Sequence, residues 1–429
     1  MKTLALIATV LLFACKKEDT ALKTGNISKQ TTDTLTTDTS TTEFLGFDSY
    51  GQSLSVGGDA GKVAYVVSST QKYNSVMPNL GVRSIEYKKQ VPVSFVPLIE
   101  QVSSDGTFGE TLVSGACEMF AQSYPDRPFI LHGVASGSGG QTVLQLSKGS
   151  SNYTRLTNDM QTAYVIAEGM GDTFSLGSTG YTQGEADITA GTSYDDYRQE
   201  LVQLHDDINV DVPAITGQTN SIPFIVGQVS SINRTSASMA NPGIALAQLD
   251  LCINDSGFTL ATPMYMFDYL PDNTHFDGLH YRMLAAYYGY AAKKLLVDGV
   301  KNFVYVKSTS VVKDDIYLEF NVPVAPLVFD TIQVVNPGNY GFVVKNSMGK
   351  NMKLKVVEIT GSDTVHIKCA NSPSGGQVSY AINGLLKKAG RTSGPRGCLR
   401  DSQGSTIIFD PGGTNYPLNN WTPIFRIQL

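Results

Sequence analysis

The chain has 429 residues, enough for two domains of ordinary size, and 41% of them are hydrophobic, as in a globular protein. Charged residues make up only 16%, and 32 Lys and Arg against 38 Asp and Glu leave a net charge of -6. The sequence has no basic stripe, which excludes the electrostatic footprint of a nucleic-acid-binding protein.

The N-terminus carries a targeting pattern. Lys2 precedes the apolar run Thr3–Phe13, and Ala14 and Cys15 follow. A charged start, a short apolar segment and a small residue before the cleavage point predict a secretory signal peptide over residues 1–14. The apolar run is too short to cross a bilayer as a helix. Its ending, Leu-Phe-Ala-Cys, resembles a bacterial lipobox, which implies an exported protein anchored in a membrane by a lipid on the cysteine. An ordinary signal peptide with an incidental Cys is the alternative.

Residues 15–43 consist mainly of Thr, Asp, Lys and Ser, with almost nothing apolar. Such a segment cannot bury a core. We therefore expect a flexible tether between the anchor and the folded protein.

Residues 44–299 alternate short apolar runs with longer amphipathic stretches. This pattern predicts strands interleaved with helices, and so a three-layer α/β/α domain with a mostly parallel sheet. Catalytic groups in such folds lie at the carboxyl ends of the strands. The expected strands are Lys62–Val67, Pro128–Val134, Ile222–Val229 and Thr259–Met266. The expected helices are Gly115–Ser123, Tyr153–Glu168, Tyr194–Asn209, Gly243–Asn254 and Leu279–Val297.

Residues 300–429 contain short β-branched or aromatic runs separated by Gly, Pro, Asn and Asp. This texture predicts an all-β, sandwich-like domain. Its one candidate helix is Ile382–Lys388, and its single Trp421 is either a sugar-stacking residue or part of the core. The expected strands are Phe303–Val306, Asp315–Phe320, Tyr340–Lys345, Lys353–Ile359 and Thr364–Cys369.

Four cysteines lie beyond the N-terminal pattern: Cys117, Cys252, Cys369 and Cys398. Their spacing fits no zinc site of the CxxC kind, and no histidine has metal-ligand spacing, so we expect no metal. A bridge between the last two would suit an exported protein, and buried free thiols are the alternative.

Three short segments carry candidate catalytic groups. The first, Tyr50–Ser55 (YGQSLS), follows an apolar segment, and a glycine-containing turn after a strand can hold a serine hydroxyl exposed, as a nucleophile requires. The second is Thr182–Asp187 (TQGEAD). In the third, Asp272 stands three residues before His275, just ahead of the last long helix. That spacing lets the carboxylate bind one ring nitrogen and leaves the other to accept a serine proton.

In this order the three segments resemble the SGNH hydrolases, also called GDSL esterases. Within them they are most similar to the branch of sialate O-acetylesterases and acetylxylan esterases, which has GQS near the start, QGE in the middle and DxxHF with a downstream Tyr near the end. The resemblance covers residues 44–299. It implies that Ser53 is the nucleophile, His275 the general base and Asp272 the acid that orients it.

Two nearby residues compete for these roles. Ser55 lies in the same turn, but the family's serine directly follows Gly-Gln. Asp277 and His280 form a second Asp-x-x-His motif that overlaps the first. The aromatic residue after the histidine and the Tyr farther on place His275, not His280, in the family's register.

Acyl transfer needs hydrogen-bond donors for the oxyanion of the transition state. The family uses the N–H of the nucleophile and a Gly N–H from a second block. In this chain the resemblance implies Ser53 and Gly140 for these two donors. Gly139, in the same Gly-rich turn, is the alternative to Gly140.

The third donor of the family is a side-chain amide, and here the chain departs from the pattern. Asp187 stands where the GxND motif would continue, and an ionised Asp cannot donate a hydrogen bond. Gln183 is the nearest candidate donor. Glu185 is either a second carboxylate that orients His275 or a residue of a salt bridge or helix start.

The resemblance implies a serine esterase that removes acetyl groups from a carbohydrate without a metal or organic cofactor. An exported anchor, a tether and a β-domain suit an acetylated carbohydrate outside the cell. Two alternatives stay open. In the first, the substrate is a lipid or aryl ester. In the second, the protein is a carbohydrate-binding surface lipoprotein whose catalytic site has decayed.

Overall fold

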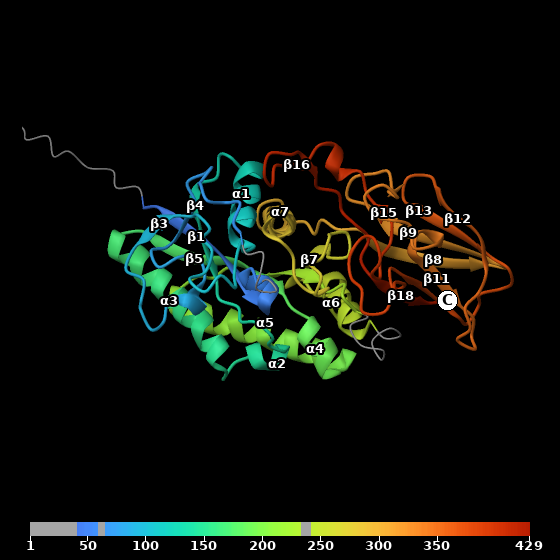
Figure 1. The fold of residues 1–429 in the computed structure, drawn as a ribbon, viewed down its shortest axis with the longest axis horizontal. Coiled ribbons are helices and arrows are strands. Elements are labelled where there is room, and N and C mark those ends of the chain that lie inside the picture. The colour runs from blue at the N-terminus through green and yellow to red at the C-terminus, as the bar shows by residue number, and fades with distance from the viewer. Residues whose placement is uncertain (1–40, 59–64, 233–241) are drawn as a thin grey trace, which may run out of the picture. The chain divides into compact units, whose positions relative to one another are not determined.

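Seven strands form one sheet in the first part of the computed structural model, in the order β3-β2-β4-β1-β5-β6-β7 (Figure 1). Every neighbouring pair is parallel except β2 and β3. The structure describes residues 41–58, 65–232 and 242–429. The strands are β1 Glu43–Gly51, β2 Val76–Pro78, β3 Phe95–Pro97, β4 Phe129–Ala135, β5 Thr173–Thr182, β6 Phe224–Gln228 and β7 Phe258–Pro263.

Helices cover both faces of this sheet. In Figure 1, α1 and α7 lie on one side of it and α3 and α5 on the other. The central strands are almost wholly buried, as expected of a parallel sheet between two helical layers. The predicted α/β/α class with a mostly parallel sheet is therefore confirmed. The helices are α1 Val113–Ser123, α2 Val143–Leu146, α3 Ser151–Met170, α4 Glu185–Ala190, α5 Tyr194–Thr216, α6 Gly243–Asn254 and α7 Gly278–Leu296.

Capping residues fix where the long helices begin. Ser150 accepts a hydrogen bond from the Tyr153 N–H at the start of α3, and Ser193 does the same for α5 through Asp196. These side chains satisfy backbone donors that have no partner inside the helix. The helix boundaries therefore follow from local sequence.

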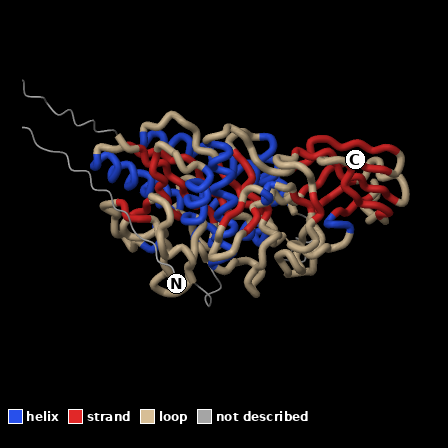
Figure 2. The backbone as a smooth tube through the Cα atoms, turned by 90° about the horizontal axis from the view of Figure 1, so that it is seen from above, coloured by secondary structure: helices blue, strands red, loops and turns tan. Residues whose placement is uncertain are grey.

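The rest of the chain forms antiparallel sheets, which Figure 2 shows as red strands gathered around the C-terminus. The larger sheets have the orders β12-β13-β9-β8 and β11-β14-β18. Rings of Phe320 and Phe425 meet between them at 6.2 Å, so the predicted all-β region is confirmed. The strands are β8 Tyr305–Val312, β9 Asp315–Asn321, β10 Val328–Phe329, β11 Phe342–Lys345, β12 Leu354–Thr360, β13 Thr364–Cys369, β14 Gln377–Tyr380, β15 Leu399–Arg400, β16 Ile408–Phe409, β17 Tyr416–Pro417 and β18 Phe425–Gln428.

The β-rich region packs directly on the parallel sheet. The Gln228 side chain at the end of β6 exchanges two hydrogen bonds with the backbone of Ile424, at 3.0 and 2.8 Å. The Tyr265 hydroxyl donates to the Thr422 carbonyl at 2.7 Å. Residues 41–429 form one compact unit, and the division at residue 300 stays a prediction.

Two expected elements are wrong. Lys62–Val67 was expected to be a strand; residues 62–64 lie outside the described part, and 65–67 are not in a strand. The N–H groups of Val67 and Ser68 donate instead to the buried carboxylate of Glu110, at 2.7 and 3.0 Å, which replaces ladder bonds. Ile382–Lys388 is not a helix, because it lacks a face to bury: Leu385 is 64% exposed and Lys387 has a φ of 56°.

The N-terminal predictions concern residues that the structure does not describe. The signal peptide over 1–14, Cys15 and all but the end of the tether over 15–43 lie outside the described residues. In the part that is described, no helix is both long and apolar enough to span a membrane. The remaining four cysteines are buried free thiols, so the expected alternative of a bridge between Cys369 and Cys398 is not formed.

Candidate active site

A tight turn at the end of β1 positions Ser53. Gly51 has a φ of 136°, and a Cβ at this position would lie 2.1 Å from the Thr182 carbonyl oxygen, so only glycine fits. The Gln52 N–H donates to that same carbonyl at 3.0 Å. Ser53 then begins a short 3₁₀ helix, Ser53–Val56. The serine is therefore held at the carboxyl edge of the sheet, where such folds place reactive groups.

A second turn, just before α7, positions the histidine. One carboxylate oxygen of Asp272 accepts the N–H groups of Thr274 and His275, at 2.9 and 3.1 Å. Its other oxygen lies 2.5 Å from Nδ1 of His275. Burial opposes ionisation of Asp272, but these hydrogen bonds outweigh it and lower its pKa to about 2. The carboxylate therefore stays charged at ordinary pH and holds the Nδ1–H tautomer of the ring.

The two turns meet. The Oγ atom of Ser53 lies 2.7 Å from Nε2 of His275, although 222 residues separate them in the sequence. With Nδ1 bound to Asp272, Nε2 is left to accept the serine proton. The structure thus brings the three residues that the resemblance pointed to into one hydrogen-bonded chain.

A pocket of about 620 Å³ opens over this chain of groups. Its lining includes Ser53 and His275, and most of its other residues are Gly, Ala or Thr. Among the described residues that line it, Phe108 is the only Phe, Tyr or Trp, and none is Leu, Ile, Val or Met. The described walls of the pocket therefore have no long aliphatic side chain.

Backbone donors are available beside the serine. As the first residue of its helix, Ser53 has an N–H without an acceptor inside that helix. Gly139 and Gly140, in the turn after β4, both line the pocket. A Cβ on Gly139 would lie 3.7 Å from the Cβ of Ser53, whereas one on Gly140 would meet nothing within 4 Å. Both glycines are thus near the serine, and Gly139 is the one that faces its side chain.

The Gln183 amide does not lie in the pocket, contrary to the expectation for the third donor. Gln183 is 0% exposed, and its Nε2 donates to the Gln141 carbonyl at 3.1 Å and to the Asp187 carboxylate. Its Oε1 accepts the Tyr197 hydroxyl at 2.9 Å. The Asp187 carboxylate and the Gln141 carbonyl take both N–H groups of this amide, so the Gln183 side chain has none left for a substrate.

Gln52 is a pocket residue that the sequence analysis did not single out. Its side chain is 3% exposed, and its Oε1 accepts the Ala186 N–H at 3.1 Å. That bond fixes which end of the amide is the nitrogen, and Nε2 has no hydrogen-bond partner among the described residues. The signal was present in the sequence, because Gln52 directly precedes Ser53 in the GQS motif.

Glu185 lines the pocket but does not orient His275. Its Oε1 accepts the Ser231 hydroxyl at 3.1 Å. Both ring nitrogens of His275 are already taken, one by Asp272 and the other by Ser53. No ring nitrogen is therefore left for a second carboxylate.

The competing residues are used elsewhere. Ser55 is fully buried and donates to the Gln52 carbonyl at 2.7 Å. His280 pairs with Asp277, whose side chain caps the start of α7. Neither residue is among those that line the pocket.

The C-terminal region supports the histidine turn. The Arg391 guanidinium forms two contacts of 2.8 Å with the Asp268 carboxylate, and its backbone N–H donates to the Phe267 carbonyl at 3.2 Å. The Ala389 N–H donates to the Asn273 side chain at 3.2 Å. Asn273 has a φ of 58°, a left-handed conformation that Asn adopts more readily than most residues, and this contact holds its side chain.

Within residues 41–58, 65–232 and 242–429, no group of three or more His, Cys, Asp or Glu is placed to hold a metal ion. The fold and the site together define an α/β protein with a serine, a histidine and an aspartate in one hydrogen-bonded chain.

No protein-family model and no curated protein sequence matches the chain. Among solved structures, a carbohydrate acetylesterase from Xanthomonas citri is similar, with a TM-score of 0.54 and 14% identity over 90% of this chain and 80% of that one. A protein from Arabidopsis thaliana (TM-score 0.43, 15% identity, 60% of this chain and 100% of that one) and NanS (0.41, 13%, 60% and 98%) also match. At these identities the first similarity establishes a shared fold.

Proposed function

We propose that the protein is a serine esterase that removes O-acetyl groups from a carbohydrate through an acyl-serine intermediate. The observation that supports this most is the 2.7 Å contact between Ser53 Oγ and His275 Nε2, with Asp272 on the other ring nitrogen. These groups stand at an open pocket, which gives an ester carbonyl access to the serine. No metal or organic cofactor takes part in the proposed reaction.

In the proposed mechanism, Ser53 Oγ attacks the ester carbonyl while His275 Nε2 takes the serine proton. The charged Asp272 stabilises the imidazolium that forms. His275 then gives the proton to the sugar oxygen as the carbon–oxygen bond of the ester breaks. Water, activated by the same nitrogen, attacks the acyl-serine, and acetate leaves with Ser53 restored.

The oxyanion of each tetrahedral intermediate needs preorganised donors. We assign this role to the N–H group of Ser53, to that of Gly140 or its neighbour Gly139, and to Nε2 of Gln52, which replaces Gln183 as the third donor. Nε2 of Gln52 has no partner among the described residues and Gln52 lines the pocket, so the oxyanion that develops beside the nucleophile can accept this N–H.

An acetyl ester of a carbohydrate suits the lining of the pocket. Gly139, Gly140 and Ala186 leave room for a methyl group, and the Thr side chains can bind hydroxyls. The shared fold with a carbohydrate acetylesterase agrees with this substrate class. A lipid ester is less favoured, because long aliphatic side chains are absent from the described lining. Export as a membrane-anchored lipoprotein stays part of the proposal, on the N-terminal pattern alone.

The test is hydrolysis of p-nitrophenyl acetate by the full chain. We expect Ser53→Ala to lower kcat by about 10⁴- to 10⁶-fold, as for other nucleophilic serines. Ser55→Ala, two residues away and buried, serves as the matched control and should stay within about 10-fold of wild type, since it loses one backbone hydrogen bond. Equal activity in Ser53→Ala and wild type would overturn the proposal.

Acetate release from a panel of acetylated polysaccharides, acetylated xylan and sialic acid esters then defines the substrate. Release from one of them supports the carbohydrate proposal. Cleavage of the aryl ester with no acetate from any member of the panel would move the substrate to lipid or aryl esters.

A further inference from the structure

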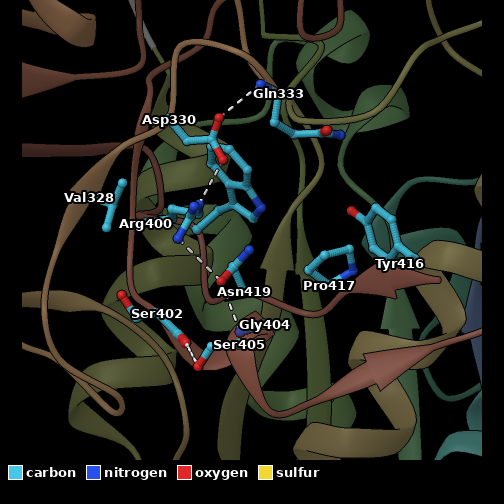
Figure 3. A pocket seen from close by; sticks show the side chains of 11 residues that line it. Val328, Asp330, Gln333, Arg400, Ser402, Gly404, Ser405, Tyr416, Pro417 and Asn419 are labelled. Atoms are coloured by element: carbon cyan, nitrogen blue, oxygen red, sulfur yellow. Dashed lines mark hydrogen bonds and ion pairs between the residues drawn. The ribbon is translucent and has the colours of Figure 1, made fainter.

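A second cavity lies in the C-terminal region, and none of the described residues that line it also lines the pocket at Ser53. It has a volume of about 380 Å³ and is bounded by β10, β15, β17 and the short 3₁₀ helix Gln403–Ser405 (Figure 3). This volume is at the lower end of the range for small-molecule sites.

The polar side of this cavity is built from an ion pair and its neighbours. Nε of Arg400 lies 2.8 Å from the Asp330 carboxylate, and Nη1 donates to the Asp401 carbonyl at 2.7 Å and to Asn419 Oδ1 at 3.3 Å. Asn419 Oδ1 also accepts the Gly404 N–H at 2.8 Å. These contacts hold the polar groups in place before any ligand arrives, which lowers the entropy lost on binding.

Several donors of this frame have no partner. Nη2 of Arg400, Nδ2 of Asn419 and the side-chain amide of Gln333 make no hydrogen bond with the described residues. Asn419 is 8% exposed, and its Nδ2 is not among the buried polar atoms that lack a partner, so the atom is open to the cavity. Polar groups placed this way are expected to bind acceptors within the cavity.

Charge and shape narrow the class of ligand. The Arg400 charge is balanced by Asp330: burial opposes its ionisation, but hydrogen bonds from the Gln333 N–H and Arg400 outweigh this and hold its pKa below the usual value. A neutral frame of donors favours hydroxyl groups over a phosphate or carboxylate. Figure 3 shows Tyr416 and Pro417 across the cavity from Asp330 and Arg400, and Trp421 also lines it. One polar side and one apolar side match a sugar ring, which has hydroxyl edges and CH faces.

The cavity also connects to the catalytic part of the chain. Arg391 donates from Nη1 to the Gln333 carbonyl at 3.2 Å, and the same guanidinium holds Asp268 ahead of the histidine turn. The Tyr416 ring packs against Tyr287 of α7, with ring centres 6.3 Å apart. A ligand in the cavity would therefore be held on the same compact unit as the serine.

We propose that this cavity binds an uncharged sugar residue of a polysaccharide chain, separately from the pocket at Ser53. Binding here raises the local concentration of the polymer at the catalytic serine without contributing to the chemistry. The site does not depend on ester cleavage, so it can be tested apart from the proposed function.

The test is the affinity of the full chain, in a Ser53→Ala background that prevents hydrolysis, for soluble xylan, glucan, mannan and galactan, with acidic pectin as the charged comparison. Two variants change the cavity: Ser405→Trp fills it, and Gln333→Ala removes a side-chain amide that makes no hydrogen bond with the described residues. Gln161→Ala, an exposed Gln on α3, is the matched control.

We expect at least one neutral polysaccharide to bind, with affinity lowered at least 10-fold by Ser405→Trp and about 5-fold by Gln333→Ala, the loss of one hydrogen bond. Gln161→Ala should bind like the parent, and both cavity variants should hydrolyse p-nitrophenyl acetate normally when Ser53 is present. The proposal is overturned if no neutral polysaccharide binds, if only pectin binds, or if neither cavity variant weakens binding. If the cavity variants weaken binding but the protein that retains Ser53 cleaves no ester, the esterase proposal is wrong and the proposed sugar site is supported.

Discussion

Two neighbouring turns of this molecule have the same local design and different surroundings. In the first, Nδ1 of His275 lies 2.5 Å from Asp272, and in the second, Nδ1 of His280 lies 2.7 Å from Asp277. Each carboxylate also accepts the backbone N–H of its histidine, at 3.1 and 2.8 Å. The spacing Asp-x-x-His is thus sufficient to build a paired imidazole twice in nine residues.

The two turns differ at the far ring nitrogen. Nε2 of His275 lies 2.7 Å from the Ser53 hydroxyl, whereas Nε2 of His280 lies 3.9 Å from the Asp268 carboxylate. Local sequence makes the acid–imidazole pair, and the arrangement of β1 against the segment before α7 places only one pair beside a serine hydroxyl. Chemistry here is a property of tertiary placement.

The largest expected effect tests this contrast directly. His275→Ala should lower kcat for p-nitrophenyl acetate by about 10⁴- to 10⁶-fold, because the serine loses its base. His280→Ala is the matched control, and its kcat should stay within about 10-fold of wild type, because His280 lies at the start of α7 and does not line the pocket. Comparable losses in both variants would erase the distinction between the turns.

A smaller effect is expected on the serine side of the site. Gln52→Glu keeps the acceptor for the Ala186 N–H but replaces the free Nε2 donor by a carboxylate oxygen. We expect kcat to fall about 10²- to 10³-fold, as for loss of one oxyanion donor. A kcat within about 3-fold of wild type would remove Gln52 from the proposed oxyanion site.

The smallest effect concerns the support of the first turn by the C-terminal region. Arg391→Ala should lower kcat about 10-fold with little change in KM, because a displaced His275 no longer holds its Nε2 at hydrogen-bond distance from the Ser53 hydroxyl. Arg391→Lys should recover part of this loss, because it keeps a positive charge near Asp268. Lys388→Ala, exposed in the same loop, is the control. A change in KM with no change in kcat, or no recovery of kcat in Arg391→Lys, would argue against a positioning role for Arg391.

Much of the fold could be predicted from hydrophobic periodicity. The helix Gly243–Asn254 and the strand Thr364–Cys369 have the predicted bounds. The central strand β5 was not among the expected strands, because its sequence TFSLGSTGYT is rich in small residues. Tertiary contacts explain why small residues stand in this strand: a Cβ on Gly180 would lie 2.6 Å from the Phe47 ring.

The site shows the same division. Proximity of Ser53 and His275 could be predicted from the order of three motifs, although their catalytic roles stay predictions. The side chain that donates the third hydrogen bond could not be predicted, because this depends on which neighbouring residue binds the side chain of Gln52 and which binds that of Gln183. Asp187 draws the Gln183 amide into the core, while Ala186 turns the Gln52 nitrogen toward the pocket. Spacing along the chain carries no information on these choices.

The most direct test of the central claim is covalent labelling of the full chain with a fluorophosphonate, followed by peptide mass spectrometry. We expect one adduct, on Ser53, that is absent in Ser53→Ala and formed far more slowly in His275→Ala than in His280→Ala. An adduct on Ser55 or another residue, or ester hydrolysis that continues with Ser53 unlabelled, would contradict it.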